Sequence, residues 1–534
     1  MPWLRQEWPP PYHIPVLEAI SQKPAGFVVQ SGRQTRMEFN SFTFLFLVLP
    51  LSLIGHLLLP RKVRPLFLIA ASLFLYYWSE GRYAWLLPVL VLLLYAAGRF
   101  MKPVGDGRKG RAAFVSLLLF LVLLLVYFKY GAFLGANING VRGLLGAPSL
   151  RFRPIHLPLG LSFFLFSAIS ALIDLRRGLG GERPGLRSVA LYVVLFPKLL
   201  TGPLVTFRQF LQLEGEAGVT AARILRGIRR FVLGLGKKVL LADTLARVAT
   251  PIFGLPVGQL DARLAWIGLI AFALQIYYDF SGYTDMAIGL GAIFGYDFPE
   301  NFRHPYASRS ITEFWSRWHM TLSQWLRDYV FLPVAYRLLD LLKRERYLAL
   351  RSEQWAYFGA TTATMVLCGL WHGASWTFVA WGVYYALFLI VEHLRAGRRK
   401  KRRGAWAPWG HLHTMLVVVL GWVLFRSPTL PLAGSYVKAL LGFGAGSGTV
   451  FLPALFLDAE SVVAGVLALA GAFPLIPWAG ERLNRLLAGR PTGRPDPLRL
   501  TLASARLLYL ASVAALSTLY LVGGTYHPFL YLRF

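Results

Sequence analysis

The sequence predicts an all-α, polytopic membrane protein built as one large membrane domain. Of its 534 residues, 56% are hydrophobic and 15% are charged, and the mean hydropathy is +0.52. A soluble domain of this size does not need so much apolar surface, because a single globular core stops growing well before this length. The apolar residues also gather in runs close to the ~20 residues that a helix needs to cross a bilayer.

The chain opens with a segment that differs from the rest. Residues 1–36 contain six prolines and scattered charges without a long apolar run. We expect a disordered N-terminal extension or an incorrectly assigned start, because Met37 leads directly into the first apolar segment. The membrane domain is expected to cover residues 37–534, with its catalytic core at about 190–395.

Apolar segments then follow one another along the whole chain. They lie at roughly 41–59, 66–79, 83–98, 113–130, 157–174, 188–205, 224–246, 262–280, 283–298, 311–334, 355–371, 374–392, 412–426, 459–477 and 505–523. Several are short or contain Gly and Pro, which membranes tolerate where protein or a water-filled cavity covers the backbone. We therefore expect about eleven transmembrane helices, plus re-entrant or interfacial helices around 190–210 and 280–335.

The positive charge follows the loops. The net charge is +31, but Lys and Arg lie in short runs between apolar segments, which favours the positive-inside rule over a nucleic-acid surface. The basic loops 337–351, 395–403 and 482–506 are expected in the cytoplasm, and 427–457 outside. This alternation places the hairpin tip Trp371-His372-Gly373 away from the cytoplasmic loops. The single cysteine, Cys368, excludes an internal disulfide framework.

Polar and ionisable residues concentrate between residues 279 and 372, inside aromatic and apolar surroundings. Such placement is costly in a membrane domain and indicates chemistry or transport. His372, in Leu370-Trp371-His372-Gly373, has two interpretations. It is an interfacial histidine within an aromatic belt, or a neutral imidazole that accepts a proton from a hydroxyl.

His319 falls in an expected amphipathic helix at 311–334. Trp315, Trp318 and Trp325 repeat on its apolar face, and Arg317 lies on its polar face. Such a helix lines a polar tunnel or anchors the chain along the membrane surface, and in the second case His319 only packs on Trp315.

Two aspartates flank an expected helix break. Asp279 and Asp285 surround Ser281-Gly282, between the segments 262–280 and 283–298. They are expected to cap helix ends, line an ion path or orient the histidines. Asn301 belongs to a polar connector that precedes the amphipathic helix.

Several common chemistries have no motif here. The sequence contains no Gly-x-x-x-x-Gly-Lys-Ser/Thr loop, no cysteine pair and no Gly-x-Ser-x-Gly elbow. A covalent serine enzyme, a metalloenzyme and a metal site are therefore not indicated. A transporter or channel would use similar intramembrane polar groups, but the chain shows no paired halves.

The ordered motifs resemble the membrane-bound O-acyltransferase family, in its bacterial branch of alginate O-acetyltransferase subunits and D-alanyl transfer proteins. They are Phe196-Pro197-Lys198 with Gly202-Pro203, Tyr278-Asp279-Phe280-Ser281-Gly282-Tyr283, Phe298-Pro299-Glu300-Asn301-Phe302, Ser310-Ile311-Thr312-Glu313-Phe314-Trp315 with Arg317-Trp318-His319, Trp325-Leu326-Arg327-Asp328-Tyr329, Gly369-Leu370-Trp371-His372-Gly373 and His527-Pro528-Phe529-Leu530-Tyr531. The resemblance runs from Met37 to the C-terminus, and these motifs lie between Phe196 and Tyr531.

The resemblance implies peripheral helices around a thin centre, with a funnel on each face meeting near the histidines. His372 would be the essential histidine and His319 the second polar position. The supporting or tunnel-lining residues would be Asp279, Ser281, Asp285, Asn301, Arg317, Trp318 and Trp371.

The same resemblance implies an O-acyltransferase in the bacterial cytoplasmic (inner) membrane. The donor would be acetyl-CoA or an acyl-carrier thioester entering from the cytoplasm, and no cofactor would be bound permanently. The acceptor would be a hydroxyl on an envelope polysaccharide, or a periplasmic serine-hydrolase-like partner transferase. The rival inside this family is D-alanyl transfer to teichoic acid from a carrier-protein thioester.

Overall fold

The computed structural model describes residues 38–101, 107–153, 155–179, 184–215, 218–396, 408–444, 451–488, 497–523 and 529–530. The extension predicted at 1–36, most of the basic run 395–403, and parts of 427–457 and 482–506 lie outside these residues. In the described chain the regular secondary structure is helical, as the composition predicts, apart from one two-stranded hairpin. An all-helical build is what a membrane demands, because each helix satisfies its own backbone hydrogen bonds.

The elements run in three groups along the chain. The first is α2 (Leu49–Leu58), α3 (Arg64–Glu80), α4 (Leu86–Phe100), α5 (Arg108–Leu125), α6 (Gly131–Leu144) and α7 (Leu161–Arg176). The second is α8 (Leu186–Val194), α9 (Phe196–Leu199), α10 (Phe207–Gly215), α11 (Ala221–Gly236), α12 (Asp243–Gly254), α13 (Ala262–Ile293), α14 (Ile311–Trp315), α15 (Met320–Leu326) and α16 (Leu332–Leu341).

The third group is β1 (Arg346–Tyr347), β2 (Leu350–Arg351), α17 (Ser352–His372), α18 (Trp376–Ala396), α19 (Pro408–Arg426), α20 (Leu430–Leu440), α21 (Ala459–Ala472), α22 (Leu475–Ala488) and α23 (Pro497–Val522). Short 3-10 and π-helical segments join them: η1 (Phe44–Val48), η2 (Gly81–Trp85), η3 (Val126–Tyr130), η4 (Lys237–Ala242), η5 (Val257–Gln259), η6 (Pro305–Ala307), η7 (Arg327–Phe331) and η8 (Pro453–Leu455).

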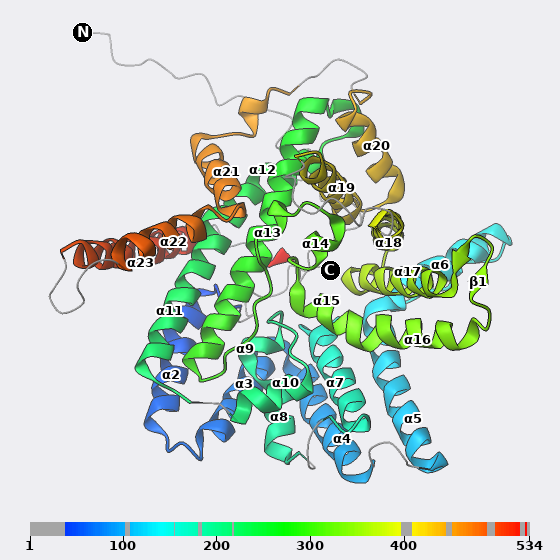
Figure 1. The fold of residues 1–534 in the computed structure, drawn as a ribbon, viewed down its shortest axis with the longest axis horizontal. Coiled ribbons are helices and arrows are strands. Elements are labelled where there is room, and N and C mark those ends of the chain that lie inside the picture. The colour runs from blue at the N-terminus through cyan, green and yellow to red at the C-terminus, as the bar shows by residue number, and fades with distance from the viewer. Residues whose placement is uncertain are drawn as a thin grey trace, which may run out of the picture.

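Helix α13 forms the centre of the molecule and packs along the continuous run of α11, η4 and α12 (Figure 1). In its most apolar stretch, 83% of the residues are buried, against 6% for the peripheral segment Arg108–Leu144 and for α23. A helix that is apolar all round and buried all round belongs in a core, while the peripheral ones keep apolar surface for lipid.

The predicted break at Ser281-Gly282 is wrong, because α13 runs without interruption over 32 residues. Gly282 serves close packing. A Cβ there would lie 2.7 Å from the Gly234 carbonyl oxygen, and a Cβ on Gly234 would lie 2.6 Å from that of Gly282. Gly227 and Gly289 repeat this contact one heptad away. The two antiparallel helices therefore touch backbone to backbone, as small residues permit inside membranes.

The prediction of a single amphipathic helix at 311–334 is also wrong. Helix α14 ends at Trp315 and α15 begins at Met320. Between them His319 adopts a left-handed conformation with φ 44°, which no α-helix of L-residues continues through. The repeating tryptophans therefore do not share one helix, because Trp315 ends α14, Trp318 lies in the turn and Trp325 belongs to α15.

Six helices of the described chain are long and apolar enough to cross a membrane, or seven if the bent pair Ala459–Ala472 and Pro477–Leu483 forms one span. The larger number of about eleven stays a prediction. The hairpin predicted from segments 355–371 and 374–392 is confirmed as α17 and α18. Their close approach depends on Gly369 and Gly382, where an added Cβ would overlap the backbone of the facing helix.

Candidate active site

His372 is the last residue of α17 and lies at the tip of the α17–α18 hairpin. Its side chain is almost fully enclosed, since 4% of the residue is exposed. Trp381 of α18 and Phe425 of α19 meet the imidazole edge to face, with ring centroids 5.1 and 5.0 Å away. This enclosure contradicts an exposed interfacial histidine and gives the imidazole a position shielded from bulk solvent.

The end of α17 is held by two residues that sequence reasoning missed. Lys129 of η3 donates hydrogen bonds to the Trp371 carbonyl and, at 3.5 Å, to that of His372. The Tyr130 hydroxyl donates to the Leu370 carbonyl at 2.7 Å. Carbonyls at a helix C-terminus have no partner within the helix and carry partial negative charge, so a lysine there is favourable. One signal was available, because Lys129 is a single charge near the end of an apolar segment.

His319 reaches the same region from the turn between α14 and α15. It is 1% exposed, and its Nδ1 lies 3.0 Å from Asn301 Oδ1. The same oxygen accepts from the Thr321 backbone N–H at 3.2 Å and from the Thr321 hydroxyl at 2.9 Å. A backbone N–H can only donate, so this amide atom of Asn301 is its oxygen and His319 Nδ1 must donate to it.

The hydrogen bond to Asn301 determines the tautomer of neutral His319. With the proton on Nδ1, Nε2 is a hydrogen-bond acceptor. Nε2 is buried and has no protein partner among the described residues. Buried polar atoms are normally satisfied, so Nε2 is available to accept a hydrogen bond from a water or from a ligand group.

Trp371 contacts both histidines. Its ring centroid lies 4.7 Å from that of His372 and 5.8 Å from that of His319. Phe163 and Phe166 of α7 pack on the same indole at 5.5 and 5.8 Å. One aromatic side chain thus contacts both imidazoles.

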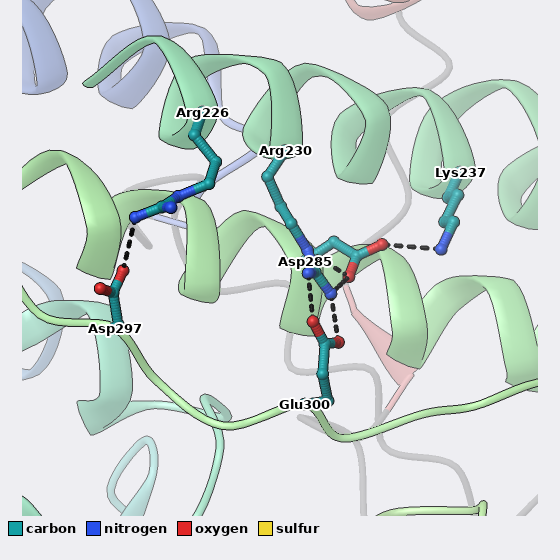
Figure 2. Close-up of polar contacts among 6 residues, drawn as sticks. All are labelled: Arg226, Arg230, Lys237, Asp285, Asp297 and Glu300. Carbon is teal, nitrogen blue, oxygen red and sulfur yellow. Dashed lines mark hydrogen bonds and ion pairs between the residues drawn. The ribbon is translucent and has the colours of Figure 1, made fainter. Parts of the chain in front are cut away.

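The two predicted aspartates lie in different surroundings. Asp279 accepts from Lys238 Nζ at 2.6 Å and from the Leu530 backbone N–H at 2.8 Å. Asp285 accepts from Arg230 at 2.7 Å and from Lys237 at 2.7 Å, at the contact between α11 and α13 (Figure 2). Because α13 is continuous, neither caps a helix end. The residue that orients His319 is Asn301, and not either of the two aspartates as predicted.

The remaining predicted residues support the site at different distances. Ser281 is buried on α13, and its hydroxyl has no partner among the described residues. Trp318 is 1% exposed and packs against Trp422 at 4.9 Å, inside the aromatic core. Arg317 is half-buried and pairs with Glu313 at 2.6 Å, so it belongs to the end of α14.

The arrangement suits proton transfer and hydrogen bonding in an enclosed space. Two buried imidazoles provide ring nitrogens that can accept a hydrogen bond or a proton. Within the described ranges, no group of three His, Cys, Asp or Glu side chains has metal-binding geometry. The funnels implied on both faces stay a prediction.

Comparison with known proteins finds one matching family and several relatives. The model of the membrane-bound O-acyltransferase family matches residues 71–425, which is more than half of the chain. The probable alginate O-acetylase of Pseudomonas putida is 34% identical over 515 residues, covering 93% of this chain and all of the relative. The peptidoglycan O-acetyltransferase of Helicobacter pylori is 30% identical over 450 residues, covering 77% of this chain and 80% of the relative.

A more distant relative belongs to the other predicted branch. The teichoic acid D-alanyltransferase of Bacillus subtilis is 28% identical over 266 residues, covering 49% of this chain and 65% of the relative. All three relatives transfer acyl groups by name, and the first two match this chain over most of its length. The chain therefore belongs to the membrane-bound O-acyltransferase family, and it is a multi-pass membrane enzyme of that O-acyltransferase class.

Proposed function

We propose that this enzyme transfers an acetyl group from acetyl-CoA toward a hydroxyl of an envelope or exported polysaccharide, either directly or through a partner transferase. The observation that carries the proposal is the pair of enclosed histidines joined by Trp371, one at a helix end and one fixed by Asn301. The relatives whose names specify acetyl transfer align over more of the chain than the D-alanyltransferase does. That difference favours an acetyl group over a D-alanyl group as the group transferred.

His372 acts as the general base in this proposal. As the acceptor oxygen bonds to the thioester carbonyl carbon, its proton moves to the imidazole. The tetrahedral intermediate then collapses, the C–S bond breaks, and the departing thiolate takes the proton from the imidazolium. Atoms and charges balance without a further reactant. General-base catalysis of this kind contributes about 10²- to 10⁴-fold in rate.

His319 holds the donor. In neutral His319, Nδ1 carries the proton and donates a hydrogen bond to Asn301. Nε2 is therefore a hydrogen-bond acceptor. An acceptor suits an amide N–H of the pantetheine arm better than a carbonyl oxygen, which needs a donor. The alternative expectation, that His319 polarises the thioester carbonyl, would require the protonated ring.

The proposal places the enzyme in the bacterial inner membrane, with acetyl-CoA entering from the cytoplasm and the acceptor from outside. Basic cytoplasmic loops raise the local concentration of an anionic coenzyme. A periplasmic serine-hydrolase-like transferase would receive the acetyl group and pass it to the polymer. If the enzyme purified without any partner acetylates the polysaccharide at its full rate, the partner is removed from the proposal.

The central test uses inside-out membrane vesicles, radiolabelled acetyl-CoA and the host's own polymer as acceptor. His372→Ala is expected to lower labelling of the polymer by about 10²-fold or more at equal protein level. The matched control is His413→Ala, because His413 is an exposed histidine on α19. Normal labelling by His372→Ala would overturn the proposed function.

A further inference from the structure

An arginine on α11 connects three parts of the chain beside the site. Arg230 Nε and Nη2 donate to Asp285 Oδ1 of α13 at 3.0 and 2.7 Å. Both terminal nitrogens also pair with the two carboxylate oxygens of Glu300, in the connector that follows α13. Figure 2 shows this guanidinium between the two carboxylates. A planar fork with several donors can give two parallel hydrogen bonds to one acid while it pairs with a second acid.

The position of Arg230 is set by the helix contact. It lies between Gly227 and Gly234 on α11, and Asp285 lies between Gly282 and Gly289 on α13. The two glycine pairs hold α11 and α13 in backbone contact. Arg230 therefore keeps a fixed position relative to Asp285. The pair to Glu300 is therefore not needed to hold these helices together. It ties the connector to them.

That connector holds His319. Glu300 directly precedes Asn301, whose side chain accepts from His319 Nδ1. The Asn301 backbone carbonyl also accepts from the Met320 N–H at 2.9 Å, and the Arg303 N–H donates to the Arg317 carbonyl at 3.0 Å. His319 has a left-handed backbone conformation that costs energy and persists only when neighbours hold it. Asn301 supplies two of these restraints, because its side chain accepts from His319 and its backbone carbonyl accepts from Met320.

We propose that Arg230, through Glu300, is a positioning residue for the Asn301–His319 hydrogen bond. This inference rests on the proposed function, in which His319 Nε2 receives the donor. Loss of the Arg230–Glu300 pair frees the connector at Glu300, and Asn301 then holds the His319 ring less firmly. The expected effect is weaker binding of acetyl-CoA, while the chemical step at His372 continues.

The chain offers a matched control on the same two elements. Asp297 lies in the same connector and pairs with Arg223 at 2.7 Å and Arg226 at 3.2 Å on α11. Its side chain is 43% exposed, against 54% for Glu300. Asp297→Asn and Glu300→Gln therefore remove the same charge from similar surroundings. They differ in that Glu300 adjoins Asn301.

The experiment measures KM for acetyl-CoA and the maximal rate in the vesicle assay. Glu300→Gln is expected to raise KM about fivefold, the scale of one partly exposed ion pair, with Asp297→Asn unchanged. A purely structural defect reduces the number of folded molecules, which lowers the maximal rate and leaves KM as it was. An equal KM in both variants would overturn the inference.

A second comparison tests the route through Asn301. In an Asn301→Ala background, Glu300→Gln is expected to add no further rise in KM, because the bond it positions is already lost. If the two substitutions raised KM independently, so that their fold-changes multiplied, the route through Asn301 would be contradicted. Arg230→Lys provides an independent variant, since an ammonium cannot give Glu300 two parallel hydrogen bonds while it also pairs with Asp285, and it should reproduce the KM rise. If His372→Ala is inactive while Glu300→Gln matches Asp297→Asn, the proposed function stands and this inference fails.

Discussion

Asp279 and Asp285 lie on the same helix, less than two turns apart, and each pairs with cations from the α11–η4 segment. Their surroundings differ. The side chains of Asp279 and Lys238 are 3% and 2% exposed, whereas Asp285 is 14% exposed and its partners Arg230 and Lys237 are about one third exposed. Enclosure, more than charge, decides what an ion pair contributes, because desolvation governs the cost of losing one partner.

The enclosed group at Asp279 includes both ends of the described chain. Lys238 also pairs with Asp243 at 2.7 Å, and the Phe529 N–H donates to Glu38 at 3.1 Å. The Phe529 ring stacks on Tyr283 at 4.6 Å, deep in the core. Phe529 and Leu530 are thus held in the core by carboxylates, which explains why the charged groups there are structural.

The largest effect is expected from Lys238→Met. It leaves Asp243 and Asp279 buried beside each other without their shared cation, which costs about 3–5 kcal/mol of unfolding free energy. The melting temperature in detergent should fall sharply. Lys237→Met, which removes a cation from the partly exposed pair of Asp285, serves as the control and should cost clearly less. Equal losses would show that enclosure does not separate the two pairs.

The backbone contact between the helices gives the next effect. Gly234→Ala places a Cβ 2.6 Å from the Gly282 carbonyl oxygen, so α11 and α13 must separate. Overpacking of this kind costs about 1–3 kcal/mol. The control is Gly434→Ala, at an exposed helical position where an added Cβ meets nothing within 4 Å. That change should be neutral or slightly stabilising. Melting temperatures of the two variants decide whether the contact is as rigid as its geometry indicates.

The sequence predicted what depends on local pattern. The helical membrane class followed from apolar runs, and the α17–α18 hairpin with His372 at its tip followed from their spacing. It failed where partners distant along the chain decide the outcome. Gly282 looked like a helix break because its partner, Gly234, belongs to another helix.

The backbone of His319 could not be foreseen for a similar reason. The three- and four-residue repeat of tryptophans is the same for one helix and for two short ones. The restraint that favours the left-handed turn comes from Asn301, in the preceding connector. Lys129 was missed because its partners are backbone carbonyls of α17, which have no sequence signature.

Asp285→Asn is expected to have an intermediate effect. Arg230 keeps Glu300, but Lys237 loses its carboxylate and the charge-assisted bonds at the helix contact weaken. We expect the free energy of unfolding to fall by about 1–2 kcal/mol. This loss lies between the contribution of a buried charged hydrogen bond and that of an exposed ion pair. Chemical denaturation in detergent measures it. A loss as large as that of Lys238→Met would place Asp285 with the enclosed group instead.

The smallest effect is expected from Asp297→Asn, at most about 1 kcal/mol, because exposed pairs gain little over hydration. Its contribution should also depend on salt. Raising the ionic strength from about 0.1 to 1 M shortens the screening length from ~10 to ~3 Å, so the stability difference from wild type should vanish. The deficit of Lys238→Met should persist at both concentrations, because ions do not enter that enclosed group. A salt-independent deficit in Asp297→Asn would mean that its pair with Arg223 and Arg226 is shielded from solvent, and the contrast between the two regions would be one of degree.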